Sequence, residues 1–518
     1  MPFTPRFCWW LLALGLSFGN PAFAPSRPPS PASAAQNSAD EAALRALSEA
    51  FFKTWAAKDL GGHLRLWSTR SPELEARRKA LQELFAGSER IELRGLAPRA
   101  VKLGGDKARV RAEVDAQVID AQTGKEKAGY GKMLRTLECV MEAGAWKVWR
   151  EISTFDELAA ALAAAQSEQQ RAALMAEEKE LATAELVRAL SGQGNRSYFK
   201  GEYPRALTSY HLAYRAAEQI GDQAGLAGVL SNIGNVYRSQ GAYAQALEHY
   251  QKSLVMSEAL KDKAGMARSV NNIGNVYFLQ GAYAQALEYY QKSSVINEAL
   301  EDKAGMARSM NNIGNVYFSQ GIYAQALEHY QKSLAMSETL DDKDAIARAL
   351  NNIGSVHKRQ SNYTLALECY RRSLAVGEAL GTNPVIADAL GNIGIVNNLQ
   401  GDYAQALECN QKSLIMRESL GDKVGIASTL NNIGVVHENL GNYMEALEHH
   451  QKSLAMHEAL GNKTMMALTL ANLGIIFGKQ GNYIRALECY QKSLPIQEAA
   501  LERLGIANTL TAIGFIHR

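Results

Sequence analysis

The residues best suited to chemistry in this 518-residue sequence are asparagines and arginines that recur every 40 residues. An asparagine amide both donates and accepts hydrogen bonds, which suits it to hold the backbone of an extended peptide. An arginine guanidinium adds charge-assisted hydrogen bonds to acidic side chains or a terminal carboxylate. The chemistry that this pattern predicts is therefore peptide binding. The candidate residues are Arg268, Asn271, Asn275, Arg308, Asn311, Asn315, Arg348 and Asn351.

The asparagines form two kinds of series along the chain. One series recurs in every full repeat from the second onward, and it comprises Asn232, Asn272, Asn312, Asn352, Asn392, Asn432 and Asn472. A bond between neighbouring repeats would require such invariance, so a structural role and a binding role are equally expected for this series. The second kind, which includes Asn271 and Asn275, persists only in the central repeats, as do the arginines. Later repeats carry Ala471, Ile475 and Leu468 at these positions, and this regional change favours binding over a merely solvated face.

Few residues suggest catalysis or metal binding. Asp59, His63 and Asp115 are the candidate acids and bases, but a turn or surface position accounts better for each of them, so no catalytic residue is predicted. Other histidines are expected at surface or packing positions, namely His249, His329, His449 and His450. No CxxC or Cys/His spacing typical of a metal site is present, so we expect no metal ion and no cofactor.

The composition excludes several classes of protein. Lys and Arg total 55 against 53 Asp and Glu, which lacks the basic excess of nucleic-acid-binding proteins, so no nucleic-acid partner is expected. Hydrophobic residues make up 47% of the chain, too many for a disordered polypeptide. All six tryptophans lie before residue 150. This shift in composition separates a small N-terminal region from a long repetitive one.

The repetitive region has a fixed period. Glycines recur 40 residues apart from Gly194 to Gly514, and 30 of 40 residues are identical between units 264–303 and 304–343. Similarity of this kind within one chain indicates duplication of a structural unit. Residues 191–518 are expected to hold eight full repeats and a truncated ninth.

Each unit is predicted to form two helices. The apolar residues of the first helix recur at steps of three and four, as in Met266, Val270, Ile273 and Tyr277. Gly281 then supplies a left-handed stop, and a second helix begins at Tyr283. An aspartate such as Asp262 caps the first helix. The small residues Gly274 and Ala286 lie where the two helices must cross closely, and Tyr290 fills the gap beside them.

These residues carry a resemblance to the tetratricopeptide repeat (TPR). The matching pattern comprises Val270, Ile273, Gly274, Tyr277, Gly281, Tyr283, Ala286 and Tyr290. The 40-residue unit with paired asparagines is similar to the repeats of kinesin light chain and Pins-type scaffold proteins. The resemblance implies a mainly α fold, a right-handed TPR α-solenoid of helical hairpins. It also implies that the asparagines and arginines line a concave groove.

The carboxylate clamps of TPR proteins offer a further comparison. The matching positions are Asn271, Asn275, Asn312, Arg348 and Asn352, which adds Asn312 and Asn352 to the predicted groove residues. Such clamps place a lysine at the first of these positions and an arginine at the last, and both are absent here. Capture of a C-terminal carboxylate is therefore not expected.

Residues 40–155 are predicted to form a small α+β domain. Apolar residues from Leu44 to Trp55 recur at helical steps, whereas residues 108–118 alternate as in a strand with one solvated face. A hairpin turn is expected at Gly144. Helices followed by a curled antiparallel sheet, with Leu66-Trp67-Ser68 in the opening helices, resemble the NTF2-like (SnoaL-like) cone. Members of that family use the pocket of the cone for small-molecule chemistry or serve as binding and dimerisation modules.

The N-terminal residues are expected to direct export. Residues 1–24 combine Arg6, an apolar run and Ala22-Phe23-Ala24, which is typical of a secretory signal peptide. Pro25 follows the expected cleavage site and hinders cleavage, so a form tethered to the membrane by the uncleaved segment is the alternative. Residues 25–39 are rich in Pro, Ser and Ala, and are expected to be a flexible linker.

Two further segments are assigned from local patterns. Residues 156–190 are expected to form a helical linker, with a capping box of Thr154 and Glu157. The chain ends within a first helix that has neither a partner nor a polar cap, as expected of a truncated product. Self-association through this uncapped helix is one expected consequence.

The sequence as a whole favours a non-catalytic, exported scaffold that binds a peptide or protein segment in its groove, in the periplasm or outside the cell. The alternative is a small-molecule-binding or enzymatic NTF2-like domain that the array targets to its place of action. Which partner is bound does not follow from the residues.

Overall fold

A computed structural model describes residues 31–127, 130–381, 383–499 and 503–516. The expected signal peptide, residues 1–24, lies outside the described residues. The chain divides into two compact units, Met1–Glu157 and Leu158–Arg518, and each is described here by itself.

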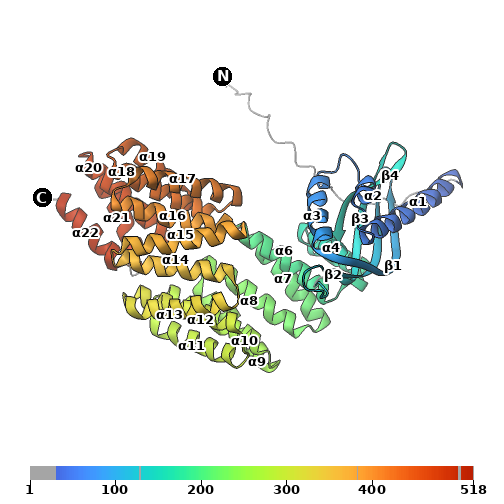
Figure 1. Ribbon diagram of the computed structural model, residues 1–518, viewed down its shortest axis with the longest axis horizontal. Helices are drawn as coiled ribbons and strands as arrows, with labels where there is room; N and C mark the ends of the chain where they lie inside the picture. The colour runs from blue at the N-terminus through green and yellow to red at the C-terminus, as the bar shows by residue number, and fades with distance from the viewer. Residues whose placement is uncertain (1–30, 128–129, 382, 500–502, 517–518) are drawn as a thin grey trace, which may run out of the picture. The chain divides into compact units, whose positions relative to one another are not determined.

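The first unit combines helices with one antiparallel sheet (Figure 1). Its elements are α1 (Pro31–Ala56), α2 (Leu60–Arg65), α3 (Leu74–Ala86), β1 (Ser88–Gly104), β2 (Lys107–Asp120), β3 (Gly131–Glu142) and β4 (Ala145–Ser153). The strands pair in the order β1-β2-β3-β4. The predicted α+β architecture of this region is thus confirmed. Because α1 begins at Pro31, residues 31–39 of the expected flexible linker are helical; proline is tolerated in the first turn of a helix.

The core of this unit follows the alternation that the sequence predicts. Every even residue of β2 from Ala108 to Val118 is buried, and these side chains pack with Phe51, Trp67 and Leu137. The hairpin between β3 and β4 turns at Ala143 and Gly144, whose φ angles are 50° and 79°. Positive φ at both positions is what a tight hairpin turn requires.

His63 is part of this core, although the sequence predicts it at the surface. The side chain is fully buried and packs against the Phe51 ring, with 4.2 Å between ring centroids and an interplanar angle of 49°. Its Nδ1 lies 3.1 Å from the Phe51 carbonyl oxygen, and its Nε2 is buried without a hydrogen-bond partner. The surface prediction is wrong because α2 lies against α1 and turns His63 inward. Asp59, as predicted, serves the turn, and accepts a hydrogen bond from the Gly62 amide at 2.8 Å.

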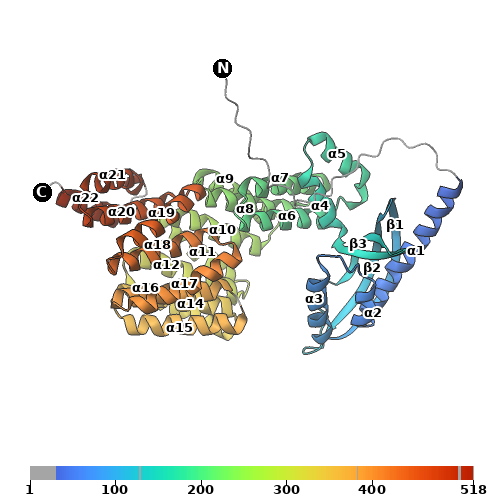
Figure 2. The same cartoon turned by 90° about the horizontal axis from the view of Figure 1, so that it is seen from above.

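The second unit is a stack of helical hairpins (Figures 1 and 2). The pairs are α6 (Ala184–Phe199) with α7 (Tyr203–Ile220), α8 (Gln223–Ser239) with α9 (Tyr243–Ala259), α10 (Lys263–Leu279) with α11 (Tyr283–Glu298), α12 (Lys303–Ser319) with α13 (Tyr323–Thr339), α14 (Lys343–Arg359) with α15 (Tyr363–Leu380), α16 (Asn383–Gln400) with α17 (Tyr403–Leu420), α18 (Lys423–Asn439) with α19 (Tyr443–Leu460), and α20 (Lys463–Lys479) with α21 (Tyr483–Ala499). Helix α22 (Arg503–Ile516) follows and packs against α21 and α20. The predicted two-helix repeat is confirmed.

The segment before the array is more broken than the sequence predicts. It consists of α4 (Thr154–Ala164), α5 (Glu168–Glu177) and a 3₁₀ turn (Lys179–Leu181), and the first repeat helix already begins at Ala184 rather than at residue 191. Thr154 and Glu157, the residues of the expected capping box, have other partners in the structure. The Thr154 hydroxyl contacts the Thr136 hydroxyl at 3.0 Å, and Glu157 pairs with Arg109 at 3.0 Å. Both side chains bind the sheet because Thr154 directly continues β4.

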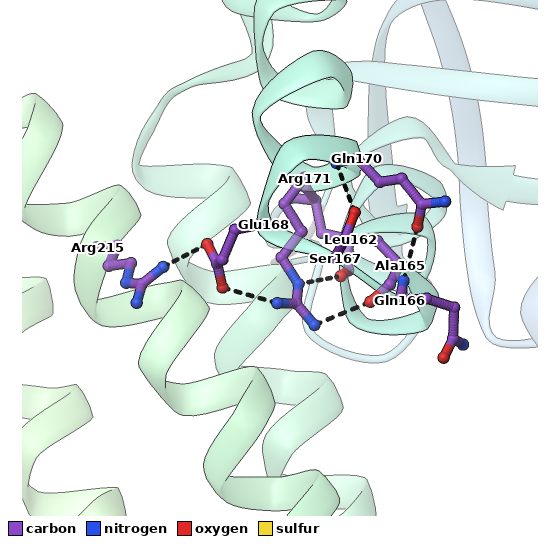
Figure 3. Close-up of polar contacts among 8 residues, drawn as sticks. All are labelled: Leu162, Ala165, Gln166, Ser167, Glu168, Gln170, Arg171 and Arg215. Atoms are coloured by element: carbon purple, nitrogen blue, oxygen red, sulfur yellow. Dashed lines mark hydrogen bonds and ion pairs between the residues drawn. The ribbon is translucent and has the colours of Figure 1, made fainter.

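Helix α5 is joined to the array by a small network of charges (Figure 3). The Glu168 carboxylate pairs with Arg171 at 2.7 Å and with Arg215 of α7 at 2.6 Å. The Arg171 guanidinium also donates to the carbonyl oxygens of Leu162 and Ala165, at the end of α4. One arginine therefore holds the turn between α4 and α5 in place.

The hairpins owe their close crossing to one contact between a glycine and a tyrosine. Tyr290 of α11 is 2% exposed, and a Cβ atom added to Gly274 of α10 would lie 2.8 Å from its ring. The next hairpin repeats this contact: a Cβ atom added to Gly314 would lie 2.6 Å from the Tyr330 ring. Since a side chain at the glycine would displace the ring, the predicted role of Gly274 at a close crossing is confirmed.

The predicted helix boundaries also hold. The Asp262 carboxylate accepts a hydrogen bond from the Gly265 amide at 3.0 Å, which caps α10. Gly281 follows the same helix with a φ of 73°, a left-handed conformation that favours glycine.

The burial of His63 predicts how the stability of the small unit depends on pH. Burial, with the nearby Arg77 charge, lowers the pKa of His63 to about 4. The folded state therefore holds His63 neutral, whereas the unfolded chain takes up a proton below about pH 6.5. Stability is complete above pH 6.5 and falls as the pH drops toward 4. We expect a loss of about 2 kcal/mol between pH 7.5 and pH 5.

Tryptophan fluorescence during urea unfolding measures this loss in the full chain, because the repeat region contains no tryptophan. The variant His63→Asn keeps a donor for the Phe51 carbonyl and removes the titrating ring. It should unfold at nearly the same urea concentration at both pH values. An equal pH dependence in the variant would show that His63 is not the cause.

Candidate functional site

The first helices of the hairpins form the inner side of the stack. Consecutive first helices, from α6 through α8, α10 and onward to α22, pack against one another. The second helices of neighbouring hairpins are farther apart. Such a difference in spacing curves a stack toward its first helices. The predicted asparagines and arginines all lie on these first helices.

A pocket of about 430 Å³ opens on this inner side, over α12, α14, α16 and α18. Its lining includes five of the predicted residues, namely Asn311, Asn315, Arg348, Asn351 and Asn352. The other five predicted residues lie outside this pocket, namely Arg268, Asn271, Asn275, Arg308 and Asn312. The structure thus brings half of the predicted set together in one place.

One asparagine series builds a ladder between repeats. The Asn312 side-chain amide donates to the Asn271 oxygen at 2.8 Å, and Asn352 donates to Asn311 at the same distance. Asn472 repeats the bond to Asn431 at 3.1 Å. This geometry supports the structural interpretation of Asn312 and Asn352, which the sequence left open. The amide nitrogens of Asn271 and Asn311 are not used by this ladder.

A second asparagine series holds the buried tyrosines. The Tyr290 hydroxyl donates to the Asn275 oxygen at 2.8 Å, and Tyr330 donates to Asn315 at 2.7 Å. The sequence favours a binding role for both asparagines, but their oxygens are committed within their own hairpins. The pairing has a partial signal in the sequence: Ile395 and Val435, in place of the asparagine, accompany Asn410 and His450 in place of the tyrosine, whereas the repeat with Ile475 keeps Tyr490.

The arginines divide into two groups. Arg268 lies 3.7 Å from Asp262, whereas no carboxylate of the described residues lies within 4.0 Å of Arg308 or Arg348. These two exposed guanidinium groups are available to an external anion. Within the predicted set, they are the arginines that form no ion pair with the described residues.

Sequence reasoning missed two charged residues of the pocket. Arg417 of α17 is 15% exposed and pairs with both Asp388 and Asp422, at 2.6 Å each. Asp388 occupies the position of the arginine series in α16. The sequence could have indicated this ion pair through Arg417 itself. The corresponding positions of the two preceding repeats hold the small residues Ser337 and Gly377.

Family models of the tetratricopeptide repeat match most of the array. One model matches residues 185–259, 265–339, 345–419 and 425–518, and a second matches residues 232–294. The chain belongs to the tetratricopeptide repeat family. The predicted TPR array is therefore confirmed. Its first repeat begins before residue 191, since the family match starts at residue 185.

Several solved structures are similar to the TPR array at low sequence identity. BtubC (BKLC) from P. vanneervenii is 17% identical over 43% of this chain and 90% of that one, with a TM-score of 0.35. A Rap protein in complex with Competence and Sporulation Factor is 17% identical over 67% and 96%, with a TM-score of 0.47. Aspartyl phosphate phosphatase F from Bacillus subtilis is 15% identical over 67% and 95%, with a TM-score of 0.46. No curated protein sequence matches the chain.

The small unit holds a second, smaller cavity of about 100 Å³. Aromatic side chains line it, together with Glu151, which pairs with Arg77 at 2.7 Å and with Arg135 at 3.6 Å. None of the candidate acids and bases named above lines this cavity, and ligand pockets are usually several times larger.

Two further observations concern the described residues only. Within them, no three His, Cys, Asp or Glu side chains are grouped closely enough to hold a metal ion. No helix of the same residues combines the length and apolar character needed to cross a membrane.

The tyrosine–asparagine bond predicts different costs for the same substitution in two hairpins. Tyr290→Phe leaves the Asn275 oxygen without its donor, which should lower the free energy of unfolding by about 1 kcal/mol. Tyr490 is similarly buried, but Ile475 stands in the place of the asparagine in its repeat, so Tyr490→Phe should change stability little. Urea unfolding followed by circular dichroism compares the two variants. Equal losses would mean that the hydroxyl bond does not contribute.

Proposed function

We propose that this protein is a non-catalytic scaffold whose TPR array binds an extended peptide or protein segment along the inner side of its first helices. The pocket over α12, α14, α16 and α18 is the observation that carries this proposal. The amides of this surface can both donate and accept hydrogen bonds, and a peptide backbone supplies both acceptors and donors.

The groups at the pocket suit an extended backbone. The Asn351 side chain lines the pocket, and its oxygen is buried without a hydrogen-bond partner; a rotation of this side chain would present the oxygen to a backbone N–H group. The amide nitrogens of the ladder asparagines can donate to backbone carbonyl oxygens. These contacts fix a main chain without specifying its side chains, and the exposed arginines add a preference for negative charge.

A pair of charge-matched double variants tests the groove. Arg308→Gln with Arg348→Gln removes two unpaired positive charges from the inner side. Arg205→Gln with Arg372→Gln removes two exposed charges from second helices, where each arginine has a glutamate partner. Recovery of the partner from an extract of the native cells should fall about tenfold or more with the first variant only. Equal recovery with both variants would contradict binding in the groove.

We also propose that the protein is exported, on the evidence of the sequence pattern in residues 1–24. Cleavage after Ala24 would produce a mature chain that begins at Pro25. N-terminal sequencing of the protein from its native cells distinguishes this chain from the tethered form, which keeps Met1. A full-length protein recovered with the cytoplasmic fraction would contradict export.

We also propose two accessory roles. The order of helices and antiparallel strands in the small unit supports the NTF2-like resemblance, but its cavity is small, so the array carries the main function. Leu510 and Phe515 of α22 are 51% and 70% exposed, which supports pairing with a second copy. Light scattering of the full chain and of a chain without residues 506–518 should then give different masses, and equal masses would contradict the pairing.

A further inference from the structure

The asparagine ladder is interrupted at the centre of the pocket. Gly391 of α16 replaces the asparagine that would accept the next ladder bond from Asn432. One repeat earlier, the Asn351 oxygen would accept from Asn392 by the same pattern, yet it has no hydrogen-bond partner. The ladder resumes between Asn472 and Asn431. The pocket therefore lies where the protein does not complete its own network.

No neighbouring side chain fills the space at Gly391, which is itself buried. A Cβ atom added there would meet only the Ser413 hydroxyl, at 3.6 Å, which is an ordinary contact. Glycine in a helix interior costs stability relative to most residues. No close packing contact requires glycine at position 391. The space beside this part of the helix backbone is therefore suited to the side chain of a ligand.

The charge of the gap favours an anion. Two arginines, Arg348 and Arg417, line the pocket with one acidic residue, Asp388. The Arg417 guanidinium binds both Asp388 and Asp422, at 2.6 Å each, so its charge is already shared between two carboxylates. The Arg348 charge has no such partner. It lies three residues before Asn351, on the same face of α14.

We propose that this gap seats the side-chain carboxylate of an aspartate or glutamate within the bound segment. Arg348 binds the carboxylate, and the Asn351 oxygen accepts a backbone N–H group of the same segment. Asp388, Ser428 and Leu468 follow Arg348 at the same position of successive first helices, so the positive charge ends here. The acidic residue therefore fixes the register of the segment along the groove. This proposal rests on the proposed function of the array.

A random peptide library displayed with amidated or fused C-termini, selected on the immobilised full chain, tests the seat. Selected peptides should share an aspartate or glutamate at one position. Replacing that residue with asparagine or glutamine in a synthetic, C-terminally amidated peptide should weaken binding about tenfold or more. The amide excludes capture through a terminal carboxylate; a peptide that binds only with its free C-terminus would overturn the proposal.

Two variants of the protein complete the test. Arg348→Gln removes the charge, and Gly391→Asn fills the gap with the residue that the ladder expects. Both variants should weaken binding of the selected peptide about tenfold. The control variants Arg372→Gln and Gly192→Asn make the same exchanges away from the pocket and should leave binding unchanged. Circular dichroism confirms that Gly391→Asn remains folded.

The outcomes separate the two proposals. Selected peptides without a shared acidic residue, or peptides that bind Arg348→Gln and Gly391→Asn as tightly as the unchanged chain, overturn the acidic seat and leave groove binding intact. A library that yields no peptide binding above a surface without protein overturns groove binding and the seat together.

Discussion

The contact between a glycine of the first helix and a tyrosine of the second determines how the rest of the array is built. The ring of Tyr290 packs where a side chain on Gly274 would lie, so the two helices approach closely and at one orientation. The tyrosine hydroxyl then reaches Asn275 and holds that asparagine toward the inner side. Because the contact recurs in successive hairpins, the inner faces of the first helices align into one continuous surface.

The inner surface uses the same residue type for two purposes. The oxygens of Asn275 and Asn315 accept from tyrosines, and those of Asn271 and Asn311 accept the ladder bonds between repeats. These bonds add to the stacking of repeats that cannot bury their apolar faces alone. The Asn351 oxygen, which lines the pocket beside the unpaired Arg348, has no hydrogen-bond partner among the described residues.

The repeat architecture could be predicted from the sequence because its causes are local: glycine stops, aspartate caps and apolar steps of three and four recur in every unit. Strand β1 was not predicted, since irregularities near Gly95 and Pro98 disturb its alternation. Half of the predicted groove residues line the pocket. Periodicity identifies the face of a helix but not the partner of a side chain, which is why the commitment of Asn275 and Asn315 to tyrosines was missed. The two glycines that precede His63 suggested a surface position, and only packing against α1 shows its burial.

Photo-crosslinking in native cells tests the central claim most directly. Benzoylphenylalanine at Ser428 places the crosslinker in the pocket, whereas at Ile415, which is 65% exposed on α17, it lies on a second helix outside the pocket. Binding on the inner side predicts a crosslinked partner from position 428 and little from position 415. Crosslinking from position 415 alone, or equally from both, would contradict the account.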